Sequence, residues 1–210
     1  KPLAEYISVT GSLTSLDLTS NCFDGPTTNE ILRLQVANPT LISLCGLVPG
    51  QTTADFSERA LQASDVKMLA TELKSGAVDG TSFLRSIDLS SNGLEPTALQ
   101  TLCEALAPNA ALTRLELSGN RLGTDGALAV CHALASNRSL TELGLRRNSL
   151  GTEGWMAVFG HPMALQPRVW NLAGEGISSE AAMTLADYVA RSPNLTSLSI
   201  VSNDVTGKAA

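Results

Sequence analysis

The stretch LTRLELSGNRL, from Leu112 to Leu122, recurs along the chain with its apolar residues and its asparagine at the same positions. The other copies are LTSLDLTSNCF from Leu13, LRSIDLSSNGL from Leu84, LTELGLRRNSL from Leu140 and LTSLSIVSNDV from Leu195. The copies that start at 84, 112 and 140 lie 28 residues apart, and a weaker copy, PRVWNLAGEGI, starts at Pro167. A constant period of this length is the signature of a repeat protein.

Each copy predicts a short strand followed by a bend. The apolar residues alternate with outward ones, so Leu115 and Leu117 are expected to point into the core while Glu116 faces outward. The asparagine that follows can hydrogen-bond to backbone groups where the strand ends. We therefore expect a structural ladder of side-chain amides, formed by Asn21, Asn92, Asn120, Asn148 and Asn203.

A helix is predicted after each strand. The segment from Gly123 is amphipathic and begins with Thr124 or Asp125 as a cap, and a later helix has Ser178 in that role. Pro96 falls in a first helical turn, where its missing N–H is tolerated. One strand and one helix per repeat predict a right-handed α/β solenoid, a horseshoe arc with parallel strands on its concave face and helices on its convex face.

These repeats resemble the ribonuclease-inhibitor-like class of leucine-rich repeats over nearly the whole chain. The segment SLCGLVPGQTTADFS, residues 43–57, is also similar to a segment of uncharacterised leucine-rich-repeat proteins of algae and other protists. The resemblance implies protein recognition by the concave surface and its rim. The same architecture serves enzyme inhibitors, NOD-like receptor sensors, axonemal components and the GTPase-activating protein for Ran, so the resemblance is specific for fold and weak for function.

The period breaks between residues 41 and 61. Gly46 stands where an apolar residue is expected, and a second strand-like piece follows too soon for a helix to intervene. This spacing predicts either a coil whose helix is replaced by a loop or a local hairpin centred on Pro49 and Gly50. In the second piece, Arg59 takes the place of the ladder asparagine.

Residues 1–210 are predicted to form a single leucine-rich-repeat domain of about seven coils. The opening residues resemble the helix of an earlier coil, and the last strand motif has no helix behind it. Solenoids need polar capping units at both ends. We therefore expect this stretch to be a fragment of a longer solenoid or part of a larger assembly.

Composition and charge point away from several partners. The formal charge of −6, from 20 acidic and 14 basic residues, argues against nucleic acid and anionic membranes as partners. No apolar run approaches the roughly 18 residues of a membrane span, and the first residues lack the pattern of a signal peptide. Four cysteines without a CxxC pair predict a reducing, cytoplasmic location.

No arrangement typical of catalysis is present in the sequence. Cys103 and Cys131 are expected to pack in the core, and the two histidines, His132 and His161, lack the spacing of a metal site. Phosphate-loop and nucleophile-elbow motifs are also missing. We therefore predict no enzyme activity, cofactor or metal. Trp155 is expected to pack in the core or to emerge on the convex face as a partner anchor.

The outward strand positions form the candidate binding surface. Four coils place an acidic residue there, and arginines occupy outward or strand-exit positions from Arg114 onward. The predicted partner-binding residues are Asp17, Asp55, Asp88, Glu116, Arg114, Arg146, Arg147 and Arg168. Adjacent carboxylates repel, so an acidic column favours a basic partner. The concave face is expected to be acidic toward the N-terminus and basic toward the C-terminus.

The sequence thus predicts a non-catalytic protein–protein interaction scaffold that binds a partner through its concave face and rim. Its alternatives are a regulator of an enzyme, of the GTPase-activator or enzyme-inhibitor type, and a structural subunit of a large complex. Protein partners are expected. Nucleic acid, direct membrane insertion and small-molecule substrates are not.

Overall fold

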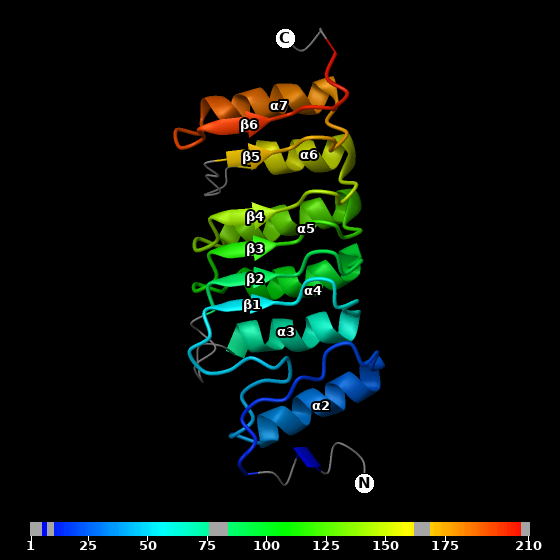
Figure 1. Ribbon diagram of the computed structural model, residues 1–210, viewed down its shortest axis with the longest axis vertical. Helices are drawn as coiled ribbons and strands as arrows, with labels where there is room; N and C mark the ends of the chain where they lie inside the picture. Colours follow the sequence, from blue (N-terminus) through cyan, green and yellow to red (C-terminus); the bar gives the residue numbers. More distant parts are fainter. Residues whose placement is uncertain (1–5, 8–10, 76–83, 162–168, 207–210) are drawn as a thin grey trace.

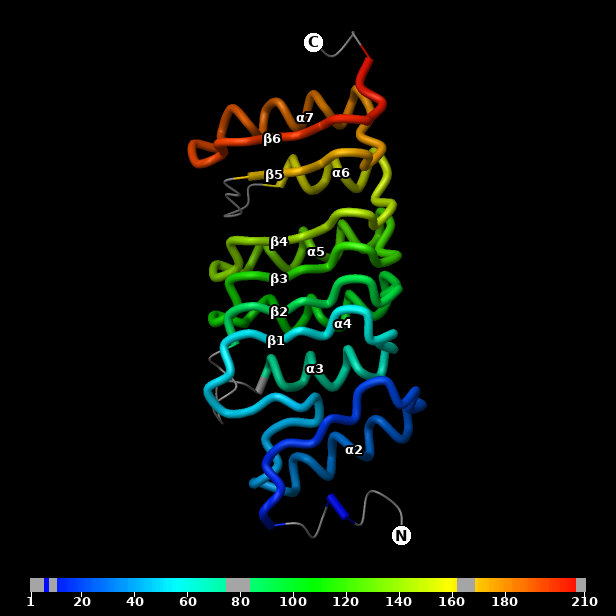
Figure 2. Tube along the Cα trace, in the orientation of Figure 1, coloured from blue at the N-terminus to red at the C-terminus, as the bar shows by residue number. Residues whose placement is uncertain are grey.

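The computed structural model describes residues 6–7, 11–75, 84–161 and 169–206, in which helices and strands alternate along the chain. Figures 1 and 2 show the strands stacked as one layer with the helices behind them as a second layer. The elements are α2 (Gly25–Ala37), β1 (Thr53–Asp55), α3 (Ala63–Ser75), β2 (Ser86–Asp88), α4 (Pro96–Leu106), β3 (Arg114–Glu116), α5 (Gly123–Ser136), β4 (Glu142–Gly144), α6 (Gly151–Gly160), β5 (Val169–Asn171), α7 (Ser179–Ala190) and β6 (Ser197–Ser199).

The strands are parallel and follow the repeat register. β1, β2, β3 and β4 form one sheet in chain order, and β5 and β6 form a separate pair. Ile87 pairs with Leu115, and Leu115 pairs with Leu143, so equivalent residues of neighbouring repeats lie side by side. The prediction of an α/β repeat solenoid is confirmed. We call the side formed by the outward strand residues the sheet face and the opposite side the helix face.

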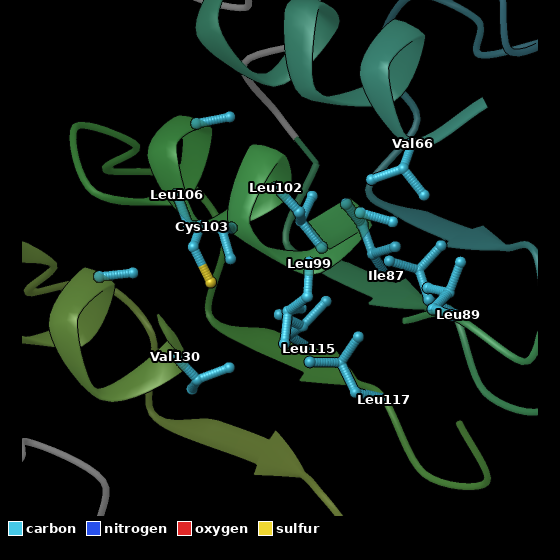
Figure 3. Packing of buried hydrophobic residues seen from close by; sticks show 14 of the residues in the cluster. Val66, Ile87, Leu89, Leu99, Leu102, Cys103, Leu106, Leu115, Leu117 and Val130 are labelled. Carbon is cyan, nitrogen blue, oxygen red and sulfur yellow. The ribbon is translucent and has the colours of Figure 1, made fainter. Parts of the chain in front are cut away.

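The core lies between the two layers. The inward strand residues Leu115 and Leu117 are 1% and 0% exposed, as the alternating pattern predicts. Helix α4 covers them with Leu99 and Leu102, which are also fully buried (Figure 3). Because each repeat has the same small space to fill, Leu, Ala, Val and Cys recur at equivalent positions and few aromatic rings fit.

The predicted asparagine ladder is confirmed. The Asn120 side-chain amide donates to the carbonyl of Leu117 in its own coil and to that of Leu89 in the preceding coil. Its Oδ1 accepts from the backbone amides of Asn92 and Leu94. One side chain therefore satisfies four backbone groups at the bend, where no strand ladder or helix can reach them.

The helix starts differ in part from the prediction. Ser178 caps α7 by accepting from the Ala181 amide at 3.2 Å, and Pro96 opens α4, both as predicted. The predicted cap of α5 at Thr124 or Asp125 is wrong, because the helix already begins at Gly123 without a side-chain cap. The Thr124 hydroxyl instead donates to the carbonyl of Leu150 in the next coil, at 2.8 Å.

The irregular segment takes the form of a coil without its own helix. Residues 14–18 and 42–46 exchange backbone hydrogen bonds, after which Gly46 turns the chain with φ +75°. A Cβ at Gly46 would lie 3.1 Å from the Cβ of Asp17, so this close approach also favours glycine. The chain then passes a turn at residues 48–51 and enters β1, which pairs with β2 of the following coil. Among the described residues no strand ladder makes the alternative hairpin.

The last coils depart from the leucine pattern. Trp155 and Phe159 of α6, Trp170 of β5 and Tyr188 of α7 form a chain of ring contacts with centroids 5.1 to 5.5 Å apart. Trp155 is 1% exposed, so it packs in the core and is not an anchor on the helix face. Helix α6 ends at Gly160 and is shorter than α5, as the following His-Pro pair predicts.

Candidate protein-binding surface

Four carboxylates mark the outward strand positions of the N-terminal coils. Asp55, Asp88 and Glu116 lie side by side in the register of β1, β2 and β3. Asp17 occupies the same position in the first coil. We call these four residues the acidic column. Neighbouring strands of a sheet lie about 4.8 Å apart, so the three members on β1, β2 and β3 present closely spaced negative charges on the sheet face. Asp17 is outside this sheet and lies against Cys45 and Gly46 of the irregular segment.

Each member of the acidic column bonds to the residue two positions ahead. Oδ1 of Asp88 accepts from the Ser90 amide at 2.8 Å and from the Ser90 hydroxyl at 2.6 Å. The other three carboxylates bond in the same way to the amides and hydroxyls of Thr19, Ser57 and Ser118. These bonds fix the orientation of each carboxylate before a partner binds. Binding therefore costs less side-chain conformational entropy than it would with freely rotating carboxylates.

The hydroxyl partners were not anticipated from the sequence, although a signal was present. An acidic residue, an apolar residue and then Ser or Thr occur together at 17–19, 55–57, 88–90 and 116–118. The hydrogen bonds from Ser57 lower the pKa of Asp55, which favours its charged form. The column therefore has a structural reason to exist, in addition to any role in binding.

The acidic column ends at β4, where Gly144 stands in its row. The Glu116 carboxylate lies over Gly144 and occupies the space that a side chain there would fill. Glu116 also lies within 4.0 Å of Arg114, which contacts Glu142 of the next strand. The column thus turns into a mixed-charge region between β3 and β4.

The arginines on the C-terminal side do not form one continuous basic patch. Arg114 is paired with Glu142, and Nε of Arg146 lies 3.6 Å from Oε1 of Glu175, whose side chain is 4% exposed. Arg147 is exposed, while Arg168 lies outside the described residues. Val169 and Val201 of the last coils are each 67% exposed, so the sheet face becomes more apolar there.

An arginine that was not predicted to bind lies next to the acidic column. Arg59 was expected in the ladder position, but its side chain reaches Asp17 at 3.3 Å and lies over the Phe56 ring. Asn92 of the next coil accepts from the Arg59 and Leu61 amides instead. Any partner of Asp17 therefore competes with Arg59.

The remaining candidate groups lie in the interior or on the helix face. Cys103 and Cys131 are buried, and burial raises the pKa of Cys103 to about 12 and that of Cys131 to about 11, so both are thiols at neutral pH. Burial also lowers the pKa of His161.

Within the described ranges no group of three or more His, Cys, Asp or Glu side chains is placed to hold a metal ion. None of the described helices combines the length and apolarity needed to cross a bilayer.

The comparisons with known proteins agree with this architecture. The leucine-rich repeat family matches residues 12–26, 82–103, 109–131, 136–159 and 191–210. No curated protein matches the chain in sequence. Among the solved structures that match, Leiomodin-1 Actin-Binding Site 2 superimposes with a TM-score of 0.54 at 17% identity, over 69% of this chain and 82% of that chain. This chain is an α/β solenoid built from leucine-rich repeats.

Proposed function

We propose that this chain is a non-catalytic protein-binding scaffold and that the acidic column is the centre of its binding surface. The observation that carries the proposal is the fixed orientation of four carboxylates by their own Ser and Thr neighbours. A rigid surface loses little conformational entropy on binding. The closely spaced negative charges favour a partner segment rich in Lys and Arg.

Three features support this proposal over a catalytic one. The strand residues that face solvent are held in place by the repeat backbone. The two buried thiols of α4 and α5 are protonated at neutral pH and are therefore poor nucleophiles. Leucine-rich repeats generally mediate protein interactions. The length of the regular repeats, each with a full helix, supports the ribonuclease-inhibitor-like subtype. The four cysteines are free thiols, which fits a reducing compartment such as the cytoplasm.

A quantitative pull-down with two matched variants tests the proposal. Asp88→Lys/Glu116→Lys reverses the acidic column, and Glu104→Lys/Asp187→Lys makes the same change in net charge on exposed residues of α4 and α7. We expect the first variant to lose proteins that the wild type and the second variant retain, by about tenfold or more. Equal recovery by all three proteins would exclude the acidic column as the binding surface.

The structural neighbour supplies a first specific partner to test. Leiomodin-1 Actin-Binding Site 2 is by its name an actin-binding site, and the superposition covers most of both chains. Purified actin filaments should therefore be included in a co-sedimentation assay with the same two variants. Co-sedimentation that the column reversal abolishes would identify the partner, whereas no co-sedimentation would remove actin from the candidates without affecting the pull-down result.

A further inference from the structure

The side chain of Arg59 lies on the sheet face because it cannot take the place of a ladder asparagine. Asn92, in the same position of the next coil, turns inward and is 8% exposed. A guanidinium keeps its charge and has donors but no acceptor, so it cannot replace a buried amide that both donates and accepts. The Arg59 side chain is instead 41% exposed and extends toward Asp17 of the acidic column.

The backbone of Arg59 is fixed independently of its side chain. The Arg59 amide donates to Oδ1 of Asn92 at 3.0 Å, and the Arg59 carbonyl accepts from the Ser20 hydroxyl at 2.7 Å. Neither bond involves the guanidinium. The side chain can therefore leave Asp17 while the bend stays folded, and a substitution of Arg59 changes the charge beside the acidic column without removing these two bonds.

Two groups of the N-terminal coils hold the guanidinium. Its Nη1 donates to Oδ2 of Asp17 at 3.3 Å, and its Cζ lies 5.1 Å from the centre of the Phe56 ring. The Arg59 charge also reaches Asp55, since it adds to the Ser57 hydrogen bonds that lower the pKa of Asp55. A carboxylate beside an aromatic face suits the planar guanidinium of arginine better than the compact ammonium of lysine.

This contact is weak enough to be exchanged. The side chains of Arg59 and Asp17 are 41% and 46% exposed, and ion pairs in such positions contribute little to stability. An arginine from a bound partner can make the same two contacts, with Asp17 and with the Phe56 ring. Because Arg59 is attached to the chain, it competes with such an arginine at a high effective concentration.

We propose that Asp17 and Phe56 form a seat for one arginine side chain, which Arg59 fills in the free chain and an arginine of the partner fills in the complex. This inference rests on the proposed function, because the partner segment must bind along the acidic column. Arg59 then lowers the affinity for every basic segment. A segment with arginine regains both contacts that Arg59 gives up, whereas a segment with lysine alone regains mainly the ion pair.

Binding of two labelled probe peptides, hexaarginine and hexalysine, tests the seat by fluorescence anisotropy at low ionic strength. We expect Arg59→Gln to bind hexaarginine about two- to tenfold more tightly than the wild type does, with a smaller gain for hexalysine. The matched control Arg33→Gln removes the same charge from an exposed arginine of α2 and should stay within about twofold of the wild type.

A double variant locates the effect at Asp17. Asp17→Asn removes the negative charge and keeps the Oδ1 atom that accepts from the Thr19 amide and hydroxyl. In the Asp17→Asn background, Arg59→Gln should therefore change the affinity for hexaarginine no more than Arg33→Gln does. A full gain in this background would show that Arg59 acts by general charge and would refute the seat.

The same assay separates failure of the seat from failure of the proposed function. Equal affinities of Arg59→Gln and Arg33→Gln for hexaarginine, or equal gains for both peptides, would overturn the seat. The proposed function would survive that result if Asp88→Lys/Glu116→Lys still loses binding. If the column reversal binds both peptides as the wild type does, the acidic column fails as the binding surface and the seat fails with it.

A second measurement needs no variant. Phenylglyoxal, in excess over all guanidinium groups, modifies accessible arginines, and peptide mass spectrometry gives the rate at Arg59 relative to that at Arg33. Saturating hexaarginine should raise this ratio by about twofold or more, because an arginine of the peptide displaces the Arg59 side chain into water. An unchanged or lower ratio would contradict the displacement and overturn the proposal.

Discussion

The four-stranded sheet β1–β4 and the two-stranded pair β5–β6 are built from the same repeat and held together differently. In the larger sheet the inward positions hold the aliphatic residues Ala54, Ile87, Leu115 and Leu143. Asn92, Asn120 and Asn148 join each coil to the one before it. At the junction with β5 the inward residue is Trp170 and the ladder position holds Glu175. The sheet is interrupted at this junction.

The chemistry of the ladder residue explains the difference. An asparagine amide donates to strand-end carbonyls and accepts from amides, whereas an ionised glutamate only accepts. Glu175 accepts from the Arg147 amide and lies beside Arg146, while its backbone carbonyl accepts from the Trp155 indole. Coupling between these coils is therefore carried by a carboxylate and by aromatic rings.

The largest expected effect comes from the inward leucines. Leu115→Ala removes a fully buried side chain and should lower the free energy of unfolding by about 3–5 kcal/mol. Leu198→Ala changes the equivalent, only partly buried residue of β6 and should cost about 1–2 kcal/mol. Urea unfolding followed by circular dichroism measures both. Equal losses would mean that the two regions are packed alike.

The ladder should show the same gradient on a smaller scale. Asn120→Ala leaves four buried backbone groups without their partner and should cost about 2–4 kcal/mol. Asn203→Ala, at the more exposed last coil, should cost about 1 kcal/mol. The same urea titrations provide the comparison, and a larger loss for Asn203→Ala would contradict the assignment of Asn120 as a central coupling residue.

Glu175→Ala should lower the free energy of unfolding least, and its effect should be concentrated at the junction between β4 and β5. It removes the acceptor of the amide of Arg147, an exposed residue, and the neighbour of the half-exposed Arg146, and we expect a loss of about 0.5–1 kcal/mol. Trp155 and Trp170, the two tryptophans of the chain, both lie in this region. In the Glu175→Ala variant, the unfolding transition followed by tryptophan fluorescence should therefore have a lower urea midpoint than the transition followed by circular dichroism. Coincident transitions would show that the junction does not depend on Glu175.

The sequence was sufficient for the repeat architecture, because periodic leucines and asparagines determine strand, bend and core together. It was not sufficient for the junction, since PRVWNLAGEGI keeps the spacing of the repeat while Trp170 and Glu175 replace the usual leucine and asparagine. The contact between Glu72 and Ser43 joins residues 29 positions apart in an irregular coil, where the period carries no information. The hydroxyl partners of the acidic column could have been found from their recurrence.

Carboxyl footprinting of the chain in complex with a purified partner tests the binding surface most directly. A carbodiimide and an amine label accessible carboxylates, and mass spectrometry compares their rates with and without the partner. The account predicts that Asp55 and Asp88 become protected several-fold, while Glu104 and Asp187 on the helix face keep their rates. Protection of Glu104 and Asp187 with unchanged labelling of Asp55 and Asp88 would contradict it.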